Sequence, residues 1–159
     1  REEQDIHWHF VGGGTNTRKV LDIFHAFHEN RVTFEDYVPI ETHGFILASA
    51  NLLLLAQKEE TVGDILPSKF YSYLVAGRPL LFLGPYHSEI GHMILEKGLG
   101  LVIEIEEDLP GVASAILEMK NNPVHHLKYC FRAKAFYEEK FGLESSVQSV
   151  RQELQTLIA

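Results

Sequence analysis

Residues 67–103 read PSKFYSYLVAGRPLLFLGPYHSEIGHMILEKGLGLVI, and this stretch decides the fold class of the chain. It predicts a helix, a strand, a second helix and a second strand in turn, over residues 68–77, 80–83, 89–97 and 99–105. Gly77 with Pro79 two residues later is the usual end of a helix. Strands that are apolar on both faces and alternate with helices are typical of a parallel sheet covered by helices.

The same rhythm extends in both directions along the chain. Upstream, the pattern predicts strands and helices alternately, over residues 6–11, 20–28, 32–34, 41–49 and 51–56. Downstream, Asp108 can cap a helix, Asn122-Pro123 can open another, and the last helix carries an apolar stripe at Val147, Val150, Leu154 and Leu157. We therefore expect a doubly wound parallel α/β fold, in which ligands bind at the carboxyl ends of the strands.

Composition narrows the class of protein. The chain has 159 residues, and 22 Asp and Glu against 14 Lys and Arg give a net charge of −8 with neutral histidines. This acidic balance argues against a broad electrostatic grip on nucleic acid. The single cysteine, Cys130, cannot form an internal disulfide, which favours a reducing compartment. No apolar run approaches the roughly 20 residues of a membrane span, so we expect a single cytoplasmic domain over residues 1–159.

Two segments could carry chemistry. Gly12-Gly13-Gly14 lies between a predicted strand and a predicted helix, where backbone can approach a phosphate, although a tight turn without a ligand explains it equally well. In the second segment, Ser68 and Lys69 begin a helix, where free N–H groups favour an anion. Asp64 and Ser72 could line the same pocket. The alternative is that Ser68 only caps the helix and Lys69 is a solvated charge.

The stretch 67–103 closely resembles the carboxy-terminal half of the GT-B retaining glycosyltransferases, the glycosyltransferases group 1 family. The shared pattern is a proline, Ser-Lys, an apolar helix ending in AGRP, a strand, and a Glu-Ile helix ending in GLG. Upstream, FVGGG at 10–14, VTFEDYVP at 32–39 and ASANLLLLA at 48–56 resemble further motifs of the family in the same order. The resemblance covers about residues 6–142.

The resemblance implies a nucleotide-sugar-binding, Rossmann-like domain, the carboxy-terminal half of a GT-B fold. The amino-terminal acceptor domain and the first βα unit would then be absent from residues 1–159, and we expect these residues alone to be inactive. Carried over by position, the backbone near Tyr37 and Val38 holds the base, and Gly13 and Gly14 line the nucleotide pocket. Ser68 and Lys69 would lie near the diphosphate or the sugar.

Two positions depart from the usual family pattern of paired glutamates. They are Asp64, which keeps a carboxylate, and Ser72, which offers only a hydroxyl to the ribose. A serine there followed by SEI at 88–90 resembles the branch that builds bacterial capsule, colanic acid and O-antigen chains. We expect Asp64 and Lys69 to serve catalysis, and Glu89 to supply the missing ribose acceptor.

The function implied is retaining transfer of a hexose or acetamido-hexose from a nucleotide-sugar, a UDP-sugar in particular, to a polysaccharide or lipid-linked acceptor. By resemblance the reaction needs no cofactor and no metal, and any attachment to a membrane comes from the rest of the parent enzyme. The histidine pairs His7/His9, His25/His28 and His125/His126 lack a third ligand in a recognised spacing. The rival function is a non-catalytic α/β interaction or nucleotide-binding module whose glycine loop is structural.

Overall fold

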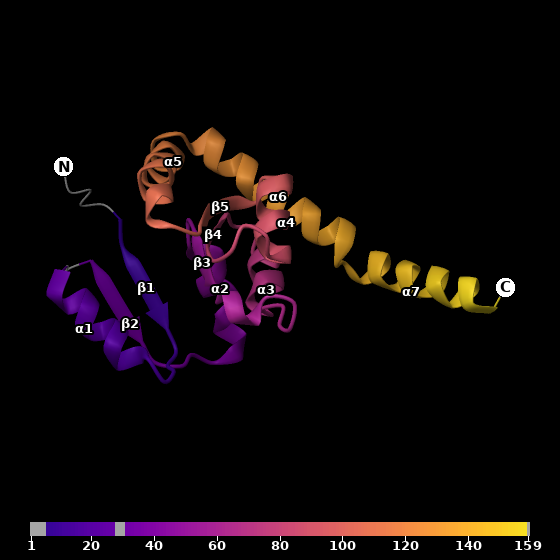
Figure 1. Ribbon diagram of the computed structural model, residues 1–159, viewed down its shortest axis with the longest axis horizontal. Coiled ribbons are helices and arrows are strands. Elements are labelled where there is room, and N and C mark those ends of the chain that lie inside the picture. The colour runs from indigo at the N-terminus through magenta and orange to yellow at the C-terminus, as the bar shows by residue number, and fades with distance from the viewer. Residues whose placement is uncertain (1–5, 28–30, 159) are drawn as a thin grey trace. The chain divides into compact units, whose positions relative to one another are not determined.

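A computed structural model of the protein describes residues 6–27 and 31–158 (Figure 1). It is an α/β protein whose strands form two parallel sheets, one of two strands and one of three. The chain divides into two compact units, Arg1–Phe45 and Ile46–Ala159. The predicted alternation of strands with helices and the predicted parallel pairing of strands are confirmed. His28, which was expected to end the first helix, lies outside the described residues.

The first unit is a small strand–helix–strand arrangement. Strands β1 (Trp8–Val11) and β2 (Val32–Glu35) pair in parallel, with Trp8 opposite Val32 and Val11 opposite Glu35. Helix α1 (Thr17–Phe27) connects them. Aromatic side chains form its interior: the rings of Phe10 and Phe34 stack with centroids 4.9 Å apart, and Phe24 lies 5.2 Å from Phe10.

The second unit is built on a parallel sheet in the order β3-β4-β5, made of Leu53–Ala56, Leu80–Leu83 and Gly100–Ile103. Helices α3 (Lys69–Val75) and α4 (Glu89–Lys97) are the crossovers between successive strands. Helix α2 (Ile40–Ser49) contains the boundary between the two units. The other elements of the second unit are the short 3-10 helices η1 (Glu59–Thr61) and η2 (Glu106–Asp108), and helices α5 (Leu109–Asn121), α6 (Pro123–Lys140) and α7 (Leu143–Ile158).

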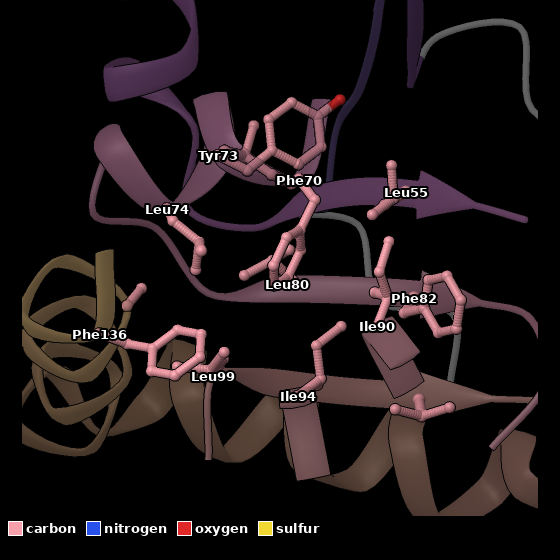
Figure 2. Packing of buried hydrophobic residues seen from close by; sticks show 13 residues of the cluster. Leu55, Phe70, Tyr73, Leu74, Leu80, Phe82, Ile90, Ile94, Leu99 and Phe136 are labelled. Atoms are coloured by element: carbon pink, nitrogen blue, oxygen red, sulfur yellow. The ribbon is translucent and has the colours of Figure 1, made fainter. Parts of the chain in front are cut away.

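Burial of apolar side chains from α3, α4 and α6 against the sheet holds the second unit together. Figure 2 shows these side chains meeting around the central strand β4. Among the described residues, eight side chains of this core are fully buried: Phe70, Leu74, Leu80, Phe82, Ile90, Ile94, Leu99 and Ala133. Each of them except the small Ala133 contributes about 1.5–3 kcal/mol relative to an exposed position, so this core fixes the sheet whose edge carries the candidate site.

Helix ends in the second unit follow the sequence signals with one exception. Gly77, at φ +62°, ends α3, and the Asn122 side chain accepts from the His125 N–H at 3.1 Å at the start of α6. The expectation that Asp108 caps α5 is wrong, because no side-chain cap bond forms there. Its carboxylate instead accepts the backbone N–H groups of Glu104 and Ile105, at 2.8 and 3.1 Å.

Helix α7 presents the predicted apolar stripe to solvent. Val147, Val150, Leu154 and Leu157 are 50–81% exposed, and α7 contacts α6 near the turn where Ser145 donates to the Gly142 carbonyl. Within residues 6–27 and 31–158, the helices are too short or too polar for any of them to traverse a lipid bilayer.

Candidate functional site

The carboxyl edge of the three-stranded sheet is where the polar residues of the second unit gather. Ala56, Leu83 and Ile103 end the three strands side by side. The ladder continues for one more step, because the Gln57 N–H donates to the Leu83 carbonyl and the Gly84 N–H donates to the Ile103 carbonyl, both at 3.0 Å. The three connections that follow therefore start from one fixed edge, the place where parallel α/β sheets bind ligands.

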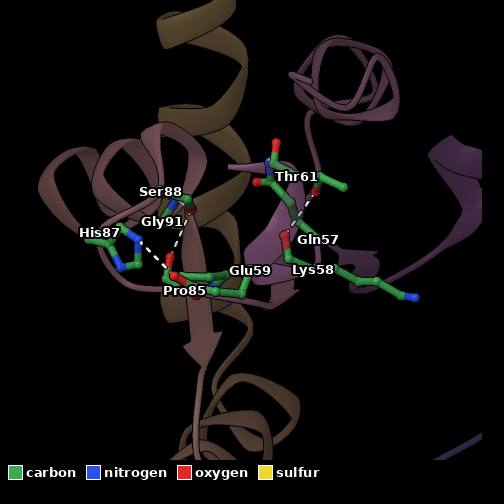
Figure 3. Close-up of polar contacts among 8 residues, drawn as sticks. All are labelled: Gln57, Lys58, Glu59, Thr61, Pro85, His87, Ser88 and Gly91. Atoms are coloured by element: carbon green, nitrogen blue, oxygen red, sulfur yellow. Dashed lines mark hydrogen bonds and ion pairs between the residues drawn. The ribbon is translucent and has the colours of Figure 1, made fainter. Parts of the chain in front are cut away.

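The first connection, between β3 and α3, carries Asp64. The Gln57 side-chain amide donates to the carbonyls of Ile65 and Thr61, at 2.9 and 3.4 Å, and Thr61 Oγ1 donates to the Lys58 carbonyl (Figure 3). Gly63 adopts φ +85°, a value that favours glycine. Asp64 is thus an exposed carboxylate on a turn that is tied to the end of β3.

Helix α3 presents the next predicted residues on its solvent side. Ser68, Lys69 and Ser72 are exposed, while their neighbours Phe70 and Tyr73 are buried in the core. Ser68 has helical φ and ψ, and its side chain makes no capping hydrogen bond. Ser68 therefore occupies the N-cap position without a side-chain capping bond, and its hydroxyl is exposed.

The second connection, between β4 and α4, positions Glu89. Ser88 is buried, and its Oγ donates to the Pro85 carbonyl at 2.8 Å and accepts from the Gly91 N–H at 3.0 Å (Figure 3). A Cβ on Gly91 would lie only 2.5 Å from the Pro85 carbonyl oxygen, so the turn packs directly on the helix backbone. Glu89, in the first turn of α4, is exposed.

Electrostatics link Glu89 to α3. Burial raises the pKa of Tyr71, and the negative charge of Glu89 adds to the rise. Tyr71 lies in α3, so the charge of Glu89 acts on a residue of the helix that also carries Lys69 and Ser72.

The third connection, between β5 and α5, is joined to the second by a hydrogen bond that the sequence did not predict. The Tyr86 hydroxyl donates to the Asp108 carboxylate and this bond, with burial and negative charge nearby, raises the pKa of Tyr86 to about 12. The same bond, with the two backbone N–H groups, lowers the pKa of Asp108. Sequence patterns gave no signal for this pair, whose residues lie on different connections.

In the first unit, the structure brings the glycine loop and the predicted base-binding turn together. The Tyr37 hydroxyl donates to the Gly13 carbonyl at 2.6 Å, and a Cβ on Gly12 would lie 3.3 Å from the Tyr37 ring. Gly14 donates its N–H to Thr17 Oγ1 at 2.7 Å. Tyr37 is 74% exposed and Val38 is half-buried, so this turn presents an aromatic ring to solvent beside the exposed backbone of Gly13 and Gly14.

The histidine pairs have protein partners where the structure describes them. His7, which directly precedes β1, bonds Thr33, and His9 within β1 bonds Glu35, both on β2. On α6, His125 pairs with Glu118 at 3.1 Å, and His126 bonds the carbonyl of Asn51 at 2.8 Å. The side chain of His25 and all of His28 lie outside the described structure.

Comparison with known proteins adds no identification. No family model matches the chain, and no curated protein matches it.

Proposed function

We propose that this chain is the nucleotide-sugar-binding part of a GT-B retaining glycosyltransferase that transfers a sugar from a UDP-sugar in the assembly of a surface polysaccharide. The observation that carries the proposal is the position of the resembling motifs. Asp64, Ser68, Lys69 and Glu89 all follow strands of one parallel sheet at its carboxyl edge. The proposed fold is Rossmann-like and doubly wound.

Lys69 supplies the positive charge that a diphosphate needs. Its ammonium is exposed in the first turn of α3, on a chain whose net charge is −8. Beside it, the Ser68 hydroxyl makes no capping bond and can donate to a phosphate oxygen. As the sugar leaves, negative charge develops on the diphosphate, and a fixed cation stabilises that charge more in the transition state than in the ground state.

The carboxylates serve the sugars of the donor. A carboxylate accepts hydrogen bonds from two neighbouring hydroxyls, and Asp64 offers such an acceptor on a turn held by Gln57. Glu89 takes the ribose, because Ser72 at the usual position has only one hydroxyl and the charge of Glu89 acts on Tyr71, the neighbour of Ser72 in α3. In the first unit, taken by itself, the backbone at Tyr37 and Val38 and the loop at Gly13 and Gly14, which the Tyr37 hydroxyl joins, are the proposed contacts for a nucleotide base. That assignment has its own test in a Tyr37→Ala variant.

Calorimetric titration of matched variants tests the assignment of Lys69. Lys69→Met keeps the length and apolar stem of the side chain and removes the charge. A lost charge-assisted hydrogen bond costs about 1.5–3 kcal/mol, so UDP should bind at least roughly tenfold more weakly, whereas uridine should be unaffected. Lys128→Met, on the exposed side of α6, is the control and should leave both affinities unchanged. Equal losses for UDP and uridine would contradict a diphosphate contact.

Glu89→Gln tests the ribose acceptor in the same titration. The amide keeps the shape of the side chain but loses one acceptor and the charge, so UDP and uridine should both bind more weakly. Glu96→Gln, later in α4, is the matched control. An unchanged uridine affinity in Glu89→Gln would refute the role of Glu89.

A further inference from the structure

Three metal-ligating side chains converge at the carboxyl edge of the three-stranded sheet, one from each connection. Glu59 begins η1 after β3, His87 lies between β4 and α4, and Glu104 directly follows β5. One ligand atom from each of the three lies within 4.8 Å of the others, and all three side chains are exposed. They are separated by 28 and 17 residues in the sequence, so no local spacing pattern reveals them.

The distances are close to those of a coordination sphere. His87 Nε2 lies 3.2 Å from Glu59 Oε1 (Figure 3). Ligands about 2.0–2.1 Å from a tetrahedral Zn²⁺ are roughly 3.3 Å apart, so this pair already has the spacing of two ligands of one ion. A carboxylate oxygen of Glu104 lies within 4.8 Å of the ligand atoms of both other residues.

The backbone of each connection is fixed independently of the three side chains. Thr61 Oγ1 bonds the Lys58 carbonyl next to Glu59, and the buried Ser88 hydroxyl holds the turn that carries His87. The Glu104 N–H is bonded by the Asp108 carboxylate at 2.8 Å. Fixed backbone beneath exposed side chains gives donors that are close together and reachable by an ion.

The charges in the cluster favour a cation. The two carboxylates of the cluster carry like charges that repel each other within 4.8 Å. Figure 3 shows the neighbouring Lys58 side chain pointing away from Glu59 and His87, so its ammonium does not occupy the space between the ligands. A divalent ion neutralises both carboxylates and binds the neutral imidazole at once.

We propose that Glu59, His87 and Glu104 bind one divalent transition-metal ion of the Zn²⁺ type. A mixed imidazole and carboxylate set suits this class, whereas Mg²⁺ and Ca²⁺ prefer oxygen ligands alone. Three protein ligands leave a position open for water or for an oxygen of a bound molecule. The site uses none of the residues assigned to the nucleotide-sugar, so the proposal stands whether or not the chain binds that donor.

Competition between the full chain and a chromogenic chelator for Zn²⁺ tests the site, with Co²⁺ absorption as a second readout. We expect one equivalent of Zn²⁺ to bind, and Co²⁺ to give the visible absorption of a bound ion. Glu59→Gln, His87→Ala and Glu104→Gln should each weaken binding at least roughly tenfold, the range by which even less direct partners alter metal affinity. All three residues are exposed, and circular dichroism checks that each variant is folded.

Three matched variants serve as controls. Glu106→Gln and His92→Ala remove exposed side chains of the same types on η2 and α4, and Cys130→Ser removes the thiol that lies 3.7 Å from His126 Nδ1. Each should bind Zn²⁺ as the wild type does. Loss of binding in Cys130→Ser but not in His87→Ala would overturn the proposal, as would a wild-type chain that binds no stoichiometric Zn²⁺.

Discussion

Ser88→Ala should destabilise the second unit through the turn that carries His87 and Glu89. The Ser88 side chain is 1% exposed, and its Oγ both accepts from the Gly91 N–H and donates to the Pro85 carbonyl. Loss of an N-cap costs about 1 kcal/mol. The Pro85 carbonyl still accepts from the Ser88 N–H at 3.1 Å, so losing its second donor adds only about 0.5 kcal/mol. We expect a total of about 1.5 kcal/mol.

Thermal unfolding followed by circular dichroism measures this loss. For a unit of this size, about 1.5 kcal/mol corresponds to a fall in Tm of roughly 6 °C. Ser114→Ala is the control, because Ser114 donates to the Pro110 carbonyl from an exposed position in α5, and alanine is the better helix former. Its free energy of unfolding should stay within about 0.5 kcal/mol of the wild type. If the two variants melt alike, the Ser88 hydroxyl does not hold the turn.

Two further substitutions test the sheet and its edge. Gly100→Ala should lower the free energy of unfolding by about 3 kcal/mol or more in urea, because the added Cβ would lie 1.9 Å from the Leu80 carbonyl oxygen. Gly111→Ala is the control and should be neutral or stabilising, because no heavy atom of the described residues lies within 4 Å of its Cβ. Equal effects of the two substitutions would refute the close approach at Gly100. Tyr86→Phe should lower stability most at neutral pH. The bond to Asp108 lowers the carboxyl pKa from its ordinary 3.8 and raises the Tyr86 pKa from 10.0 to about 12. Its contribution to the free energy of unfolding is therefore fully present between pH 3.8 and pH 10.0. That contribution is lost as the pH falls through the lowered carboxyl pKa or rises through about 12. A stability difference from the wild type that stays constant down to pH 2 would contradict the bond.

Local signals in the sequence predicted most of the second unit. Strand 80–83 and helix 89–97 have the predicted bounds. Pro79 directly precedes the strand and Gly98, at φ +61°, ends the helix, and both effects depend on local backbone conformation alone. The predicted strand 99–105 is shorter, Gly100–Ile103, since the Leu99 N–H bonds the Ile94 carbonyl at the end of α4, and the Asp108 carboxylate takes the N–H groups of Glu104 and Ile105.

The contacts within the site depend on tertiary structure and could not be predicted in this way. Asp108 was expected to cap a helix because local pattern cannot show that Tyr86 lies within reach. The convergence of Glu59, His87 and Glu104 has the same origin, since it follows from the order β3-β4-β5. A usable signal existed nonetheless: each of these residues closely follows an apolar strand, where parallel sheets expose their ligand-binding edge.

Calorimetric titration of the chain with UDP, GDP, ADP and NAD side by side tests the proposed donor-binding function most directly. We expect a measurable heat and a defined affinity for UDP, weaker or absent binding of the other three, and loss of UDP affinity in Lys69→Met. Binding of none of the four, or of NAD in preference to UDP, would contradict it.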